Sequence, residues 1–299
     1  MTKLKSLTVR TDSVLGPRRD EPVDMTKILS SLSNEINQIL LLTDKGTLSS
    51  SRCLHYFPKS LERFNNLCHL SLKMFKLDDN AIKEISNRKT LMGLEFDCYN
   101  LEHLNLQNLQ SVQDDVFTDI TDKLKKLAYL NISRCQNISG NVLVKLTNLK
   151  NLEYLDIRRI ENINDDSCKN VTSDALNELS KLENLETLYV VDVDNVGDEM
   201  FKDMYKLKIL RCNWCPNVTD VGIMRVIENA TRLETLMLCR TGITSTTLVC
   251  AADVTKKRRN NVCLEIIITS KVLKDYQLLE HDSGPLITMR GRNMCCHDC

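Results

Sequence analysis

Apolar residues recur along this chain in a fixed motif, L-x-x-L-x-L, in which the first, fourth and sixth positions are apolar. Copies after Leu101 begin 26, 25, 33, 22 and 26 residues apart. This spacing is typical of leucine-rich repeats, in which each repeat supplies one short strand and one helix. The pattern predicts an α/β leucine-rich-repeat solenoid. We expect a right-handed, horseshoe-like superhelix with short parallel strands on its concave face and helices on its convex face. The motif copies are Leu67-Leu70-Leu72, Leu101-Leu104-Leu106, Leu127-Leu130-Ile132, Leu152-Leu155-Ile157, Leu185-Leu188-Val190, Leu207-Leu210-Cys212 and Leu233-Leu236-Leu238.

A second apolar run within each repeat predicts the helices. Residues 220–232 and 174–182 show helical spacing, and Thr219 or Asp220 is positioned to cap the first of these helices. The polar stretch 162–170 explains the one long interval as an inserted loop. The apolar face of the helix at 220–232 is expected to comprise Val221, Met224, Val226 and Ile227.

The chain is expected to form one elongated domain in three parts. Residues 1–66 are degenerate N-terminal repeats, 67–270 are cysteine-containing repeats, and 271–299 form a poorly ordered C-terminal tail. Leu4-Leu7-Val9 and Ile36-Ile39-Leu41 predict degenerate strands, and Val262–Ser270 predicts the final strand. Leu91-Leu94-Phe96 also fits the motif but lies ten residues before Leu101, so its register stays open.

Two repeats carry cysteine at the ninth motif position, followed by a polar turn that leads into a helix. These segments are Arg134-Cys135-Gln136-Asn137-Ile138-Ser139 and Trp214-Cys215-Pro216-Asn217-Val218-Thr219-Asp220. Over roughly residues 60–270 the chain resembles the F-box/leucine-rich-repeat proteins, which belong to the ribonuclease-inhibitor-like superfamily. The resemblance implies a solenoid that binds a substrate protein. It also implies an F-box that docks through an adaptor on a cullin–RING (SCF-type) ubiquitin ligase.

No segment of this chain is a recognisable F-box. The family pattern ends near V-C-x-x-W, whereas the only tryptophan is Trp214, within the repeats; Phe57-Pro58-Lys59-Ser60-Leu61 echoes the opening but leads directly into a repeat strand. We therefore expect a protein–protein recognition scaffold that resembles the substrate-recognition part of the ligase, with the cullin–RING adaptor as a further candidate partner. The alternative is an adaptor or inhibitor that acts without a ubiquitin ligase.

Composition excludes several classes of partner. Forty basic and forty acidic side chains give no net charge, which argues against a nucleic-acid partner. No apolar run approaches the roughly 18 residues of a membrane span, and the N-terminal residues lack a secretory signal. We expect a cytoplasmic protein, with the nucleus as an alternative if Lys256-Lys257-Arg258-Arg259 is an import signal rather than a solvated turn. The 13 cysteines are then expected to be reduced.

Candidate chemistry is sparse. Cys212-Asn213-Trp214-Cys215 is a CxxC sequence, but both cysteines fall at inward-facing motif positions, which favours a core role over redox or zinc chemistry. The C-terminal Met294–Cys299 suits a soft metal, prenylation or a disordered tail. Because no P-loop, Gly-rich or nucleophile-elbow motif occurs, we expect no enzyme activity, no cofactor and no metal.

A binding surface is predicted by strand geometry. Side chains at motif positions three, five, seven and eight point away from the core, because strand residues alternate between the two faces. Tyrosine, tryptophan and arginine, which are enriched at binding hot spots, dominate these positions in the middle and later repeats. The surface suits an acidic or extended protein segment; the alternative is that these are ordinary solvated positions. The expected partner-binding residues are Tyr129, Arg134, Tyr154, Arg158, Arg159, Tyr189, Arg211, Trp214 and Arg240.

Overall fold

The computed structural model describes the chain over eleven ranges. Two compact units make up the chain, an N-terminal unit (Met1–Leu152 with Ile160–Lys169) and a C-terminal unit (Glu153–Arg159 with Asn170–Cys299). Both units contain parallel strands in chain order. The described ranges are 6–10, 23–24, 29–33, 35–42, 53–55, 69–73, 76–77, 102–107, 114–135, 138–160 and 171–292.

The N-terminal unit confirms both degenerate strands. Leu7 is paired with Ile39, which in turn is paired with Leu70, so the first two motifs continue the register of the later repeats. The segments predicted at Leu91–Phe96 and at 162–170 lie outside the described residues. The parallel strands are β1 (Ser6–Arg10), β3 (Gln38–Leu42), β5 (His69–Lys73), β7 (His103–Asn105) and β8 (Tyr129–Asn131), and the described helices are α5 (Asp114–Lys123) and α6 (Gly140–Leu146). A second small parallel sheet comprises β2 (Val23–Asp24), β4 (Cys53–His55) and β6 (Lys76–Leu77).

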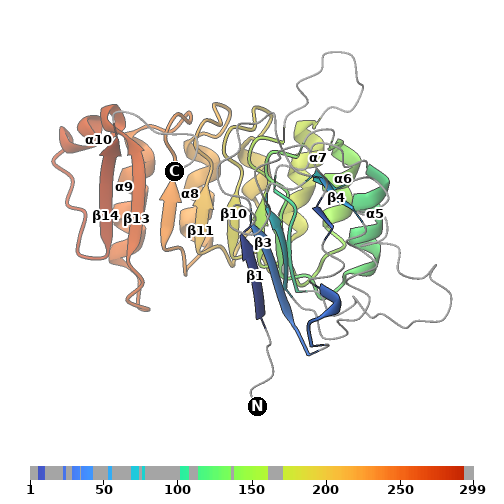
Figure 1. Ribbon diagram of the computed structural model, residues 1–299. Coiled ribbons are helices and arrows are strands. Elements are labelled where there is room, and N and C mark those ends of the chain that lie inside the picture. Colours follow the sequence, from blue (N-terminus) through green and yellow to red (C-terminus); the bar gives the residue numbers. More distant parts are fainter. Residues whose placement is uncertain are drawn as a thin grey trace. The chain divides into compact units, whose positions relative to one another are not determined.

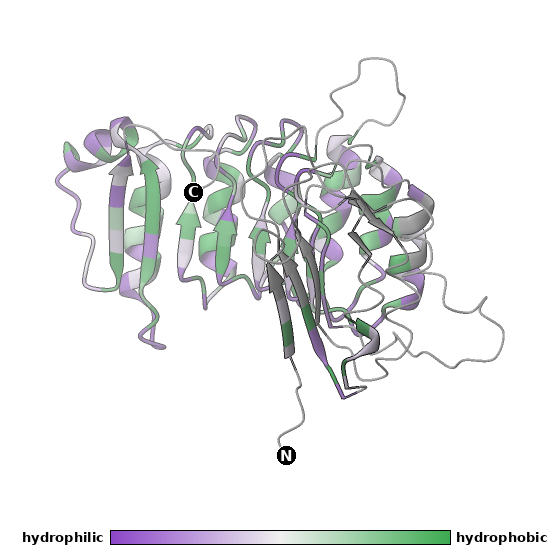
Figure 2. Ribbon diagram, in the orientation of Figure 1, coloured by the Kyte–Doolittle hydropathy of each residue, from purple (hydrophilic) through white to green (hydrophobic). Residues whose placement is uncertain are grey.

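The C-terminal unit repeats the strand-and-helix plan (Figure 1). Its helices cover one face of the sheet, and apolar residues gather on the strands and on α8 and α9 (Figure 2). The strands are β9 (Tyr154–Asp156), β10 (Thr187–Tyr189), β11 (Ile209–Arg211), β12 (Thr235–Met237), β13 (Leu264–Thr269) and β14 (Ile287–Arg292). The helices are α7 (Ser173–Asn177), α8 (Asp220–Asn229), α9 (Ser245–Lys256) and α10 (Ser270–Gln277), with 3₁₀ turns η2 (Glu178–Lys181) and η3 (Asp198–Phe201).

Motif position four forms one continuous row through the core of the C-terminal unit. Leu188 is paired with Leu210, and Leu210 is paired with Leu236, across strands β10, β11 and β12. All three side chains are fully buried. Because every repeat contributes the same motif position to the same row, the apolar stripe of one repeat covers that of the next. The fold is an α/β leucine-rich-repeat solenoid, as the motif predicts.

Helix α8 corrects one detail of the sequence analysis. Its buried face comprises Gly222, Ile223, Val226 and Ile227, whereas Val221 is 61% exposed and lies on the solvent side. The prediction of Val221 as a core residue is therefore wrong. Thr219 caps the helix as expected, accepting a hydrogen bond from the Val221 amide, and this start fixes the helical phase that turns Val221 outward.

In two places of the C-terminal unit, an aspartate side chain at a helix start binds the start of the next helix. Asp198 of η3 accepts hydrogen bonds from the amide (2.8 Å) and hydroxyl (2.5 Å) of Thr219, the cap of α8. Asp220 of α8 accepts equivalent bonds from Thr244, the cap of α9, at 2.9 and 2.7 Å, and a further bond from the Thr247 hydroxyl. In the T-D pair of the sequence, Thr219 thus caps α8, and Asp220 holds the cap residue of α9 in place.

We expect the Asp220→Asn variant to lose about 1 kcal/mol of stability at neutral pH, since charge-assisted bonds are replaced by neutral ones. Desolvation acts to raise the pKa of Asp220, but the bonds from Thr244 and Thr247 outweigh it and lower that pKa. A depressed carboxyl pKa stabilises the fold above the unfolded value of about 3.9, and this contribution is lost as the pH falls through the folded pKa. Urea denaturation of both proteins at pH 7 and pH 3 should show the difference narrowing at the lower pH; a constant difference contradicts the assignment.

The segment after residue 270 corrects the expectation of a poorly ordered tail. Helix α10 covers Ser270–Gln277, and all six residues of β14 are paired in parallel with β13. The strand predicted at 262–270 is therefore not the last strand. This addition to the sheet has no L-x-x-L-x-L sequence, which explains why the motif did not reveal it. Residues 293–299 lie outside the described part of the chain.

Candidate functional site

The nine predicted partner-binding residues divide between the two units. Seven lie in the C-terminal unit, and Tyr129 and Arg134 lie in the N-terminal unit. In the N-terminal unit the Tyr129 ring stacks on the ring of its strand partner His103, with the centroids 3.7 Å apart. The C-terminal seven are Tyr154, Arg158, Arg159, Tyr189, Arg211, Trp214 and Arg240, and we call them the arginine–aromatic surface.

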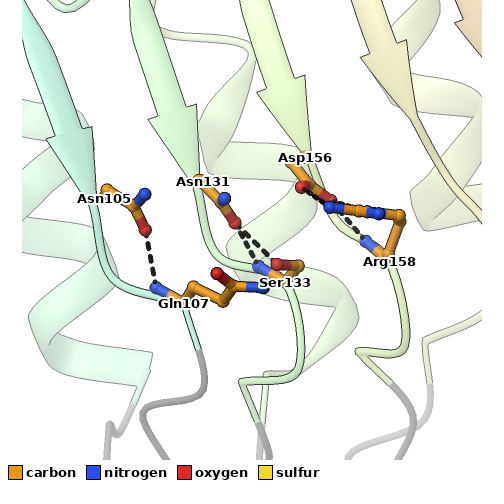
Figure 3. A network of polar contacts seen from close by, with 6 residues as sticks. All are labelled: Asn105, Gln107, Asn131, Ser133, Asp156 and Arg158. Carbon is orange, nitrogen blue, oxygen red and sulfur yellow. Dashed lines mark hydrogen bonds and ion pairs between the residues drawn. The ribbon is translucent and has the colours of Figure 1, made fainter. Parts of the chain in front are cut away.

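Polar side chains at motif position five accept hydrogen bonds from the turns that follow their strands (Figure 3). Asn105 accepts a hydrogen bond from the amide of Gln107, at 3.1 Å, and Asn131 accepts bonds from the amide and the hydroxyl of Ser133. Position five was expected to point to a partner. Instead Asn131 is 5% exposed and satisfies the turn that follows its strand. In these repeats position five is a structural position.

Asp156 has the same role in the C-terminal unit, with an added charge. This carboxylate is fully buried and accepts a hydrogen bond from the amide of Arg158 at 3.1 Å. It also binds the Arg158 guanidinium through both oxygens, at 2.9 and 2.8 Å (Figure 3). Desolvation acts to lower the pKa of Arg158, but the bond and charge of Asp156 outweigh it and raise that pKa. The Arg158 guanidinium is therefore held in place, and the carboxylate of Asp156 balances its positive charge.

The ring of Tyr189 is the centre of the arginine–aromatic surface. The Tyr154 ring of the preceding repeat meets it edge-on, with the centroids 5.3 Å apart. The guanidinium carbons of Arg158 and Arg211 lie 5.3 and 4.5 Å from the Tyr189 centroid. Two cations from neighbouring repeats thus share one tyrosine ring, which attracts positive charge through its quadrupole. The geometry brings four of the predicted residues into contact.

A second cluster lies at the turns after β11 and β12. The guanidinium carbon of Arg240 lies 4.7 Å from the centroid of the Trp214 ring. Arg240 is exposed and Trp214 is half-buried. Arg159 and Asp192, at the same turns of two earlier repeats, form an ion pair at 3.2 Å. Each member of these pairs comes from a different repeat, so only the packed solenoid can bring them together.

Motif position eight adopts a left-handed backbone in five repeats. The residues there have φ between 53° and 63°, although none is glycine or asparagine. The amides of Arg159, Asp192 and Trp214 continue the strand ladder by donating to the next repeat, at 3.2, 3.0 and 2.8 Å. Nothing in the sequence predicted this conformation, because arginine and tryptophan do not favour it. The five residues are Arg134, Arg159, Asp192, Trp214 and Arg240.

The CxxC cysteines have the core role that the motif predicts. Cys212 and Cys215 are fully buried free thiols, and the Cys215 thiol donates to the carbonyl of Val190 in the preceding repeat, at 3.2 Å. Burial raises the pKa of Cys215 to about 12 and that of Cys212 well above its usual range, so neither is a reactive thiolate near neutral pH. Cys239, however, is disulfide-bonded, so the expectation of reduced cysteines throughout is wrong.

Other predicted chemistry finds no site in the described ranges. Within them, no group of three His, Cys, Asp or Glu side chains is placed to hold a metal, and no helix has the length and apolar character needed to cross a bilayer. Met294–Cys299 lies outside these ranges. The basic run is not a simple solvated turn: Arg258 donates to the carbonyls of Leu233 and Val262 at 2.8 and 3.1 Å, and Lys256 pairs with Asp282.

The fold and this surface define a leucine-rich-repeat solenoid protein with an aromatic and cationic strand face. No protein-family model and no curated protein matches the chain. Among solved structures, an internalin from Listeria monocytogenes is similar with a TM-score of 0.42 and 15% sequence identity, over 81% of this chain and 78% of the internalin.

Proposed function

We propose that this chain is a non-enzymatic protein-recognition scaffold whose partner binds the arginine–aromatic surface of the C-terminal unit. The observation that carries the proposal is the cluster on Tyr189, in which one tyrosine ring and two guanidinium groups pack from neighbouring repeats. Tyr154, Arg158, Tyr189 and Arg211 are all half-buried rather than sunk in the core. Such side chains offer large contact area together with polar groups.

Rigidity supports the same proposal. A flexible arginine loses up to about 2 kcal/mol of rotamer entropy when a partner immobilises it. In this surface Arg158 is already fixed by Asp156, and Arg211 and Arg240 are already stacked on aromatic rings. Much of the side-chain entropy that binding would remove is therefore already lost in the free protein, which favours affinity.

The finer form of the proposal is the substrate-recognition part of a cullin–RING (SCF-type) ubiquitin ligase, acting in the cytoplasm or the nucleus. It is supported by the cysteine-containing repeats, in which Cys135 and Cys215 each donate to a position-six carbonyl of the preceding repeat, Leu106 or Val190, at 3.1 and 3.2 Å. The alternative is an adaptor or inhibitor that uses the same surface without a ligase. No segment of this sequence is a recognisable F-box.

We expect the Trp214→Ala/Arg211→Ala double variant to lose most partner binding while keeping its fold. Affinity capture from cell extract with the full chain, followed by mass spectrometry, identifies the specific partner; titration of that partner should then show at least about a tenfold loss for the variant. Tyr205→Ala/Arg232→Ala is the matched control, because both residues are exposed and lie outside the surface. Undiminished binding by a folded Trp214→Ala/Arg211→Ala protein overturns the proposal.

The same capture separates the two forms of the proposal. Recovery of a cullin and its adaptor together with the partner favours the ligase. Recovery of a discrete partner without them favours an adaptor or inhibitor. Neither result depends on the double variant, so the ligase question is answered independently of the binding surface.

A further inference from the structure

The four arginines of the arginine–aromatic surface fall into two electrostatic groups. Arg158 is paired with Asp156 at 2.8 Å, and Arg159 is paired with Asp192 at 3.2 Å. A carboxylate of the chain already faces each of these guanidinium groups. Their charges are compensated, and they contribute rigid contact area rather than an unsatisfied attraction for an anion.

Arg211 and Arg240 form the second group. In the described part of the chain neither has a carboxylate within ion-pair distance; instead each lies over an aromatic ring, at 4.5 Å from the Tyr189 centroid and 4.7 Å from the Trp214 centroid. The Nε of Arg211 is also buried without a hydrogen-bond partner. Desolvating a guanidinium without a counter-charge is unfavourable, and an incoming carboxylate offsets that cost.

Stacking on an aromatic ring leaves the edge of each guanidinium available for hydrogen bonds to a carboxylate. A ring occupies the face of a guanidinium, whereas hydrogen bonds to a carboxylate use its edge, so one arginine can do both. Arg211 comes from β11 and Arg240 from the turn after β12, so the two free edges belong to adjacent repeats. Arg211 is paired in register with Met237, three residues before Arg240, so the two guanidinium groups are offset along the strand direction as well as across the sheet. An extended chain advances about 3.3 Å per residue, so one extended segment of several residues can supply a carboxylate to each.

We propose that Arg211 and Arg240 bind an acidic, extended peptide segment of the partner, each guanidinium pairing with one carboxylate. This inference rests on the proposed function and specifies the chemistry of its partner. Across the surface, four guanidinium groups face two carboxylates, which leaves two positive charges to be matched. A protein segment fits better than a nucleic acid, because the chain as a whole carries no net charge to attract a polyanion.

The test uses a phage-displayed library of random linear peptides, selected on the full immobilised chain. We expect the enriched peptides to carry two or more Asp or Glu residues. Synthetic versions should bind about ten- to a hundredfold more weakly to Arg211→Gln and to Arg240→Gln, in line with the loss of a charge-assisted hydrogen bond. Arg232→Gln, which removes an exposed arginine outside the surface, should bind as the unmodified chain does. Circular dichroism melts should be the same for all four proteins.

The other outcomes overturn the inference and are distinguishable from failure of the proposed function. Acidic recognition is excluded if the enriched peptides have no excess of Asp and Glu, or if neither arginine variant weakens their binding. The proposed scaffold function still stands in that case, provided that the Trp214→Ala/Arg211→Ala protein loses its captured partner. No enriched peptide, when a partner is nevertheless captured, excludes a linear segment. Poly(A) RNA that competes as strongly as the acidic peptides assigns the site to nucleic acid. If no peptide is enriched and no partner is captured, the proposed function is overturned as well.

Discussion

The Leu210→Asp variant is expected to lose about 4 kcal/mol or more of stability, enough to unfold much of the C-terminal unit. Leu210 is fully buried at motif position four and is paired on both sides, with Leu188 and Leu236. A carboxylate there has no partner in an apolar row and loses its hydration. Because each repeat of a solenoid is stabilised mainly by its neighbours, the damage should spread to β10 and β12.

Thermal melting and amide hydrogen exchange are the measurements. The variant should melt at a lower temperature, and protection should fall in the strands on either side of β11. Leu210→Met is the control, because a volume-conserving apolar exchange usually costs less than about 1.5 kcal/mol. A melting curve for Leu210→Asp that matches the unmodified protein would refute the register of the repeat.

The Gly222→Ala variant is expected to lose about 2 kcal/mol, although alanine is the better helix former. Gly222 lies on the buried face of α8, and a β-carbon there would lie 2.5 Å from the Asp198 Oδ1 and 2.8 Å from the Asp198 Cα. Helix propensity alone favours alanine over glycine by about 1 kcal/mol. The clash is with backbone as well as side chain, so η3 or α8 has to shift, and the bonds from Thr219 to Asp198 are strained.

The sign of the change decides between these effects. Urea denaturation that shows stabilisation by Gly222→Ala would mean that propensity prevails and that α8 and η3 are not in close contact. Gly197→Ala provides the comparison, because its nearest atom to an added β-carbon is the Asn217 carbonyl oxygen at 3.9 Å, an ordinary contact. We expect that variant to change stability by no more than about 1 kcal/mol.

For the motif copies from Leu101 onward, the sequence alone was sufficient to predict the repeat, the strand register and the buried row. Leu188, Leu210 and Leu236 were predicted at one motif position and lie in one buried row. The core role of Cys215 was also predicted correctly, and Thr219 is one of the two residues predicted to cap α8. These features depend on residues close together in sequence and on a period that recurs from repeat to repeat. The sequence pattern is therefore enough to predict them.

Helix and tail details were less predictable. Val221 was assigned to the buried face of α8, but it is the phase set by the Thr219 cap that decides which residues face the sheet. Helix α10 and strand β14 have no leucine motif, and β14 is held by its pairing with β13. Such pairing is a tertiary contact, and its residues carry no local signal of the repeat.

Only the tertiary structure divided the arginines into two kinds. The sequence placed Arg158, Arg159, Arg211 and Arg240 on one face without distinguishing them. The fold neutralises the first two with Asp156 and Asp192 and stacks the other two on Tyr189 and Trp214. Three of these four partnerships, all except Arg158 with Asp156, join different repeats, and left-handed turns help to form two of them. A repeat pattern specifies which residues face outward, whereas the residues that meet depend on how neighbouring repeats pack.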